Sequence, residues 1–174
     1  MNRWRSLTLS LSIVVLGVIP ACEGISGPSE REKKIAAEQA LIKGYSTEVP
    51  KVDALLKQFL DAWKVANEKK DLKTYKDDLE TNVLPALDRF VTAASAMPAT
   101  SEELKAIHIP LVAAYKAAQT TLVNFTKVVT EATMDAEYAK VLGAMDEVKK
   151  AEETYLQKLQ AYYKTYRVDL QQGP

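Results

Sequence analysis

Apolar residues recur every three or four positions along most of this chain, and this spacing is the feature that most limits its fold. Such a spacing gathers apolar side chains on one face of a helix. Four segments carry such a stripe, at residues 49–66, 72–97, 104–129 and 135–166. The second stripe consists of Leu72, Tyr75, Leu79, Val83, Leu87, Phe90, Ala94 and Met97. Almost no strand-like alternation accompanies the stripes, so the sequence predicts an all-α protein.

Four amphipathic helices with short connections bury their stripes most simply against one another, in antiparallel order. We therefore expect an antiparallel four-helix bundle over residues 46–170. Asp71 is placed to cap the second helix, and Thr100 with Glu103 fits a capping box at the start of the third.

The segment before the bundle has a weaker helical pattern. Between residues 30 and 45 only Ile35 and Ile42 mark an apolar side, and Gly44 and Pro50 interrupt the pattern. We expect a short extra helix here, mobile or loosely docked, followed by a break.

Two further prolines, Pro85 and Pro110, lie inside apolar-periodic helices. An interior proline removes a backbone hydrogen bond and bends or restarts the helix. The turn near Met97 would bring the two prolines to comparable heights, where adjacent kinks could form a pocket. Kinks more often wrap a helix around its core, and we favour that interpretation.

The first 21 residues have the features of a secretory signal. Arg3 and Arg5 precede an apolar run, Leu7–Ile19, and the small residue Ala21 follows it. Thirteen residues are too few to span a bilayer, which needs about 20. We expect residues 1–21 to be a signal peptide that is removed.

Cys22, the only cysteine of the chain, directly follows this segment. Its position resembles the lipobox of bacterial lipoproteins. The resemblance implies that the cysteine sulfur receives a diacylglyceryl group, that the signal is cleaved before Cys22, and that the new amino terminus is acylated. One acyl chain holds a protein only marginally at a bilayer, whereas two or more hold it stably. The lipid bilayer is thus the first expected partner.

Residues 22–29 comprise the lipidated cysteine and a tether of turn-forming residues. As a flexible coil the seven residues after Cys22 reach about 15 Å, which would keep the domain close to the lipid surface. In enteric bacteria, a lipoprotein with Asp directly after the lipidated cysteine tends to stay in the inner membrane, and other residues permit export to the outer membrane. Glu23 at this position resembles the exported group. We expect a cell-envelope protein, lipid-anchored at the outer membrane.

Charge excludes some partners. The chain has 23 basic and 23 acidic residues, and loss of the signal leaves 21 and 23. Nucleic-acid binding would need a clearly basic face, and attraction to anionic lipid a polybasic patch. We expect no nucleic-acid partner, and attachment through the lipid alone.

His108 is the only histidine. It could be a haem or metal ligand or a proton-responsive group. Zinc needs three or four ligands, and Lys105 stands where a di-iron bundle would have the glutamate of Glu-x-x-His. We therefore expect neither a metal nor a cofactor, with His108 at the helix surface or an interface.

The end of the last helix is rich in tyrosine. The run Ala161–Arg167 resembles the end of the small periplasmic b-type cytochromes, which are four-helix bundles, but Tyr163 stands where that family has its haem-ligating histidine. The stripe spacing predicts that these tyrosine rings close one end of the core, and that Tyr163 is the tyrosine that points most toward the outside. Alternatively they form an aromatic patch that binds a protein, a glycan or an apolar ligand. His108, Tyr163 and Tyr166 are the candidate contacts.

Enzyme signatures are absent from the sequence: it has no glycine-rich phosphate loop, nucleophile elbow or nucleophilic cysteine. We expect a non-enzymatic binding or scaffolding module on an envelope lipoprotein, with an envelope protein as partner. The alternative is a periplasmic carrier or sensor bundle that holds an apolar ligand or haem near Pro85, His108 and Pro110.

Overall fold

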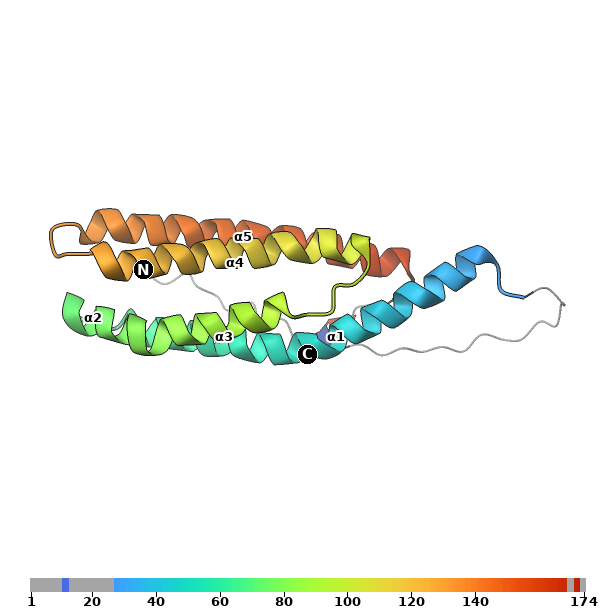
Figure 1. Cartoon of the computed structure of the whole chain (residues 1–174), viewed down its shortest axis with the longest axis horizontal. Coiled ribbons are helices and arrows are strands. Elements are labelled where there is room, and N and C mark those ends of the chain that lie inside the picture. Colours follow the sequence, from blue (N-terminus) through green and yellow to red (C-terminus); the bar gives the residue numbers. More distant parts are fainter. Residues whose placement is uncertain (1–10, 13–26, 169–170, 173–174) are drawn as a thin grey trace.

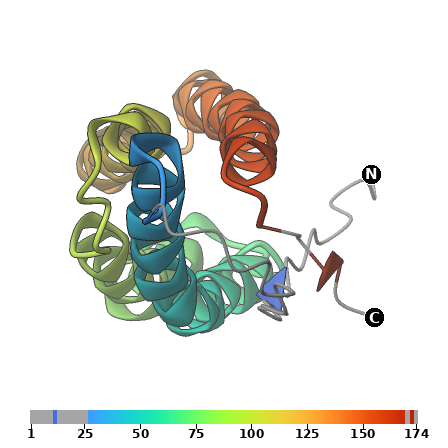
Figure 2. The ribbon, with the colours of Figure 1, turned by 90° about the vertical axis from the view of Figure 1, so that its right-hand side faces the viewer.

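The computed structural model describes residues 11–12, 27–168 and 171–172. Its helices form an antiparallel four-helix bundle, which confirms the predicted fold class (Figures 1 and 2). The elements are β1 (Leu11–Ser12), α1 (Glu30–Ala66), α2 (Leu72–Asp78), the π-helical turn η1 (Leu79–Val83), α3 (Leu84–Ser95), α4 (Glu102–Val128), α5 (Met134–Thr165) and β2 (Gln171–Gln172). α2, η1 and α3 follow one another directly and make up the second of the four rods. The two short strands pair antiparallel.

Side chains cap the starts of three rods. Ser29 and Glu32 form a capping box at α1, with the Glu32 backbone amide 3.3 Å from the Ser29 hydroxyl oxygen that accepts from it. Asp71 caps α2 as predicted, because its carboxylate accepts from the Thr74 amide at 2.9 Å. The predicted cap at Thr100 is wrong by one residue: Ser101 precedes α4 and accepts from the Leu104 amide.

The expected break between an extra helix and the bundle is absent from the described chain. α1 continues for 37 residues through both Gly44 and Pro50. Its first half is inclined to the second and reaches beyond the ends of α3 and α5 (Figure 1). Burial explains the continuity, since Ile42, Tyr45 and Val49 from this stretch are all buried. Their burial offsets the roughly 1 kcal/mol that a helical glycine costs relative to alanine.

Pro85 is accommodated by a local change of helix type. The five-residue π-helical turn η1 ends two residues before it, and the Leu84 amide donates to the Leu79 carbonyl. Such wider turns commonly mark the place where a helix cannot keep its regular hydrogen bonds. Leu79 and Val83 within this turn are fully buried, so the irregular turn still contributes to the core.

The interior consists of two clusters of buried side chains. The main core runs along all four rods and includes Phe59, Tyr75, Leu79, Leu87, Phe90, Tyr115, Leu122, Phe125, Val141 and Met145. The second cluster, which we call the end core, consists of Ile42, Tyr45, Val49, Leu104, Ile107, Leu159, Tyr162, Tyr163 and Tyr166. Only α1, α4 and α5 contribute to the end core, because α3 has already ended at Ser95. The bundle therefore changes from four helices to three along its length.

Candidate functional site where the two cores meet

His108 lies inside the protein, at the place where the bundle changes from four helices to three. The residue is 5% exposed, so of the two expected positions the helix surface is wrong, and His108 lies where α1, α3 and α4 meet. Nδ1 is 2.8 Å from the Tyr45 hydroxyl of α1, and Nε2 is 2.8 Å from the Ala94 carbonyl oxygen near the end of α3. The Ala94 carbonyl also accepts from the Met97 amide at 3.2 Å, so His108 is its second donor.

These contacts determine where the protons lie when His108 is neutral. A carbonyl oxygen can only accept, so Nε2 carries the hydrogen and donates to Ala94. Nδ1 is then the acceptor, and Tyr45 donates its hydroxyl hydrogen to it. The Tyr45 oxygen is also 2.8 Å from the Tyr155 hydroxyl of α5. Since the Tyr45 hydrogen is already committed, Tyr155 donates to Tyr45.

Burial controls the ionisation of this group. It lowers the pKa of His108, which therefore binds a proton less readily than a histidine in water. It raises the pKa of Tyr45 and of Tyr155, with smaller contributions from the neighbouring tyrosines and from the negative charge of Asp53. The three rings are neutral at pH 7.

Two carboxyl groups that the sequence analysis did not single out lie in the same part of the bundle. Asp53 on α1 is half-buried, and burial raises its pKa to about 6. Glu152 on α5 accepts a hydrogen bond from the buried Tyr115 hydroxyl of α4, and burial raises the pKa of Glu152 as well. Glu152 falls in the gap between Val148 and Tyr155 of the fourth apolar stripe, which was a signal available in the sequence. Asp53 lies beside Val52 in an uninterrupted stripe and gave no such signal.

Tyr163 is the clearest difference from the sequence prediction. It was expected to point outward, yet its side chain is 0% exposed. Its hydroxyl lies 2.7 Å from the hydroxyl of Ser46, which is buried on α1. The ring therefore helps to hold the first half of α1 against α5.

Tyr166 and Tyr162 close the end core, as the stripe spacing favoured. The Tyr166 hydroxyl donates to Glu103 of α4 at 3.0 Å, and its backbone carbonyl accepts from the Gln39 side chain of α1 at 2.9 Å. The Tyr162 hydroxyl is 2.5 Å from Glu38 of α1. These bonds explain why the first half of α1 is docked instead of loose.

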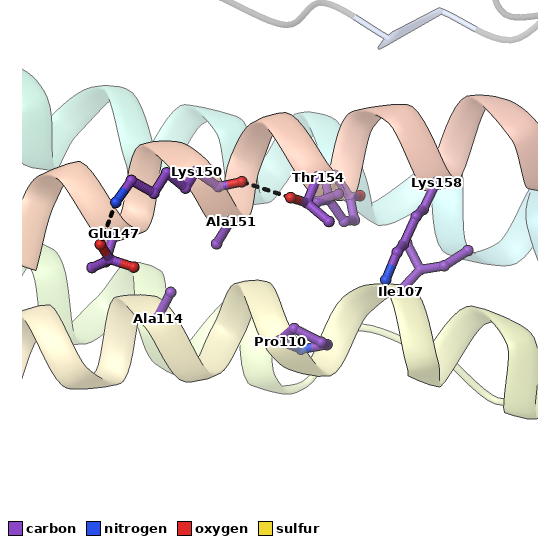
Figure 3. A pocket seen from close by; sticks show the side chains of 9 residues that line it. Ile107, Pro110, Ala114, Glu147, Lys150, Ala151, Thr154 and Lys158 are labelled. Carbon is purple, nitrogen blue, oxygen red and sulfur yellow. Dashed lines mark hydrogen bonds and ion pairs between the residues drawn. The ribbon is translucent and has the colours of Figure 1, made fainter.

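A surface groove of about 410 Å³ lies between α4 and α5. Figure 3 shows Ile107, Pro110 and Ala114 facing Ala151 and Thr154 across it, with charged side chains at its rim. A pocket formed by adjacent kinks would be lined by both Pro85 and Pro110. Pro110 lines this groove, but Pro85 does not. A second groove of about 720 Å³ lies further along the same two helices, with Phe125 and Ala144 in its lining.

Cys22 lies outside the described residues. Among the residues that are described, no cluster of three or more His, Cys, Asp or Glu side chains could hold a metal ion. None of the described helices is both long enough and apolar enough to cross a membrane.

The fold and the interior contacts define a helical-bundle protein with a buried tyrosine–histidine group. Comparisons with known protein families, with curated proteins and with solved structures find no match to this chain.

Proposed function

We propose that this protein is a lipid-anchored envelope protein whose helical bundle is a non-enzymatic binding or scaffolding module. The observation that carries the proposal is the position of Cys22, which directly follows a signal-like segment and precedes the first residue of α1 by eight positions. Acylation there would hold the amino-terminal end of α1 next to the bilayer. The proposed partners are the lipid and an envelope protein at the outer membrane.

The shape of the bundle supports a spacer or scaffold. At 1.5 Å per residue, the 37 residues of α1 extend about 55 Å. The amino-terminal end of α1 is at one end of the molecule, while the α4–α5 connection is at the other (Figure 1). An anchor at Cys22 would therefore present the α4–α5 connection far from the lipid surface.

The interior contacts favour a module that binds through its outer surface. The hydroxyls of Tyr45, Tyr155 and Tyr163 and both nitrogens of His108 are already hydrogen-bonded within the protein. A haem at His108, the alternative raised by the sequence, would have to break one of these buried bonds. The surface instead offers the grooves between α4 and α5 and the exposed apolar side chains Leu60, Val65, Ile109, Val128 and Leu142.

Fractionation of the native host tests the anchor. We expect the unaltered protein in the membrane fraction and Cys22→Ala in the soluble fraction, because no other means of attachment is expected. Ser26→Ala, in the same tether, is the matched control and should fractionate like the unaltered protein. Complete retention of Cys22→Ala in the membrane after normal signal cleavage would disprove the proposal.

A second experiment addresses the module. Crosslinking in intact cells, followed by purification of the lipidated protein, should recover an envelope protein through contacts on the α4–α5 face. An absorbance spectrum of the same preparation distinguishes this module from the alternative, a bundle that holds haem. A Soret band would show a bound haem and would contradict a module without a cofactor.

A further inference from the structure

We propose that His108 is a buried proton-binding site, and that proton uptake there reverses the hydrogen bonds of Tyr45 and Tyr155. The three side chains come from three different helices and form one continuous chain of contacts at 2.8 Å, from Tyr155 through Tyr45 to His108 and on to Ala94. Such a chain has a direction, and the direction depends on the protonation state of the imidazole.

The starting direction follows from the Ala94 carbonyl. Because Nε2–H must donate to that carbonyl, Nδ1 accepts from Tyr45, and the Tyr45 oxygen accepts from Tyr155. Every hydrogen in the chain therefore points in one direction, from Tyr155 through Tyr45 and His108 toward Ala94. Nδ1 is the one atom of the imidazole that can take up a proton.

Proton uptake can proceed along the chain without moving the backbone. A proton from water binds the Tyr155 oxygen, the original Tyr155 proton passes to the Tyr45 oxygen, and the original Tyr45 proton passes to Nδ1. Each tyrosine gains one O–H bond and loses one, and the imidazole gains one N–H bond and the positive charge. Nδ1–H then donates to Tyr45, and Tyr45 donates to Tyr155.

The reversed chain keeps all three of its hydrogen bonds, and one new donor remains. The Tyr155 hydroxyl now accepts from Tyr45, so its own hydrogen is directed elsewhere. Tyr155 also lines the groove between α4 and α5. Acidification would thus change the polarity of the wall that separates the interior from this groove.

The surroundings of the chain contain several ionisable groups. Besides its own members, the groups that act on the ionisation of Tyr45 and Tyr155 are Asp53 from α1 and Tyr163 from α5. Asp53 also acts on Tyr115 of α4, which is hydrogen-bonded to Glu152 of α5. On the helix of His108 itself, Lys105 forms an ion pair with Glu102 at the surface. From α3, the Ala94 carbonyl oxygen accepts from His108. Burial of the imidazole disfavours its charged form and lowers the His108 pKa, whereas its hydrogen bond to the Ala94 carbonyl favours the charged form.

The only histidine of the chain gives a single set of ring signals, so NMR of the full-length protein with ¹⁵N-labelled histidine tests the proposal directly. We expect the Nε2–H tautomer at neutral pH and a proton uptake at Nδ1 below pH 6.5, because burial lowers the His108 pKa. An Nδ1–H tautomer, or titration at or above pH 6.5, would overturn the proposal without any variant.

Tyr155→Phe tests the reversal itself. This variant keeps the bond from Tyr45 to neutral His108 but removes the contact between Tyr155 and Tyr45 in both protonation states. In the neutral state Tyr45 loses a second donor to its oxygen, whereas after proton uptake its buried hydroxyl hydrogen is left without an acceptor, which is the costlier loss. We expect His108 to bind its proton about fivefold more weakly, the effect of one lost buried hydrogen bond. Tyr163→Phe is the matched control, because its hydroxyl bonds Ser46 outside the chain. Equal titration of His108 in Tyr155→Phe and in the unaltered protein would refute the reversal.

Discussion

Removal of the Tyr45 hydroxyl is the most informative single perturbation of the interior. Tyr45→Phe keeps the buried ring but deletes the oxygen that joins His108 to Tyr155, with both contacts at 2.8 Å. It leaves Nδ1 of His108 without a donor and the Tyr155 hydroxyl without an acceptor. A buried polar group without its partner costs about 1–3 kcal/mol.

The two stranded groups together set the expected size of the effect. Tyr155 borders the α4–α5 groove and can regain part of its bonding with water, so we expect the free energy of unfolding to fall by about 2–4 kcal/mol. In a domain of this size that corresponds to a melting temperature lower by about 5–15 °C.

Urea unfolding of the full-length protein, followed by far-ultraviolet circular dichroism, measures this change. The matched control is Tyr138→Phe, because Tyr138 is partly exposed and its hydroxyl lies a long 3.5 Å from Asn67. We expect the control to change the unfolding free energy by less than about 0.5 kcal/mol. If Tyr45→Phe and Tyr138→Phe unfold at the same urea concentration, the chain of buried hydrogen bonds does not stabilise the protein as argued.

Two further substitutions test the charge and packing of the same interior. Asp53→Asn should raise the unfolding free energy at pH 7 by about 1 kcal/mol, a value reduced for partial solvent exposure, because burial disfavours the Asp53 carboxylate. The Asp53 pKa is raised from its ordinary 3.8 to about 6, so the native state of the unaltered protein loses stability relative to the unfolded state as the pH rises through 6. The stability gained by Asp53→Asn should therefore vanish when unfolding is measured at pH 3.5. An equal gain at pH 3.5 and at pH 7 would contradict this reasoning. Leu122→Ala should lower the unfolding free energy by about 3–4 kcal/mol, because Leu122 is fully buried in the main core, whereas Leu142→Ala on the exposed face should change it by less than about 1 kcal/mol. Comparable losses in the two alanine variants would show that the main core is placed wrongly.

The four amphipathic rods could be predicted from the sequence because the stripe spacing and the helix geometry share one period. Leu79, Leu87 and Phe90 from one predicted stripe are all buried in the main core. The boundaries were less predictable: the cap before α4 lies at Ser101 instead of Thr100, since two adjacent hydroxyl residues offer the same local signal.

The first half of α1 shows where local preferences mislead. Gly44 and Pro50 predict a break when they are read alone. In the folded protein Tyr45 and Val49 are buried against α4 and α5, and their burial outweighs the local penalties. That gain depends on contacts with residues more than 50 positions away, which a single sequence does not reveal.

The candidate site depended on the same missing information. His108 and Tyr163 lie beside the predicted stripes, so a four-helix arrangement places them near the surface. Because α3 ends at Ser95, three helices close around this end of the bundle and bury both side chains. The ring nitrogens of His108 then meet Tyr45 and Ala94 from two other helices, a contact that no motif encodes.

The mass of the mature amino-terminal peptide, purified from native membranes, tests the proposed anchoring most directly. We predict a peptide that begins at Cys22 and is heavier than its amino-acid sequence by a diacylglyceryl group and an amide-linked acyl chain. A chain that retains residues 1–21, or one that is cleaved elsewhere and carries an unmodified Cys22, would contradict the proposal that lipid at this residue holds the bundle in the envelope.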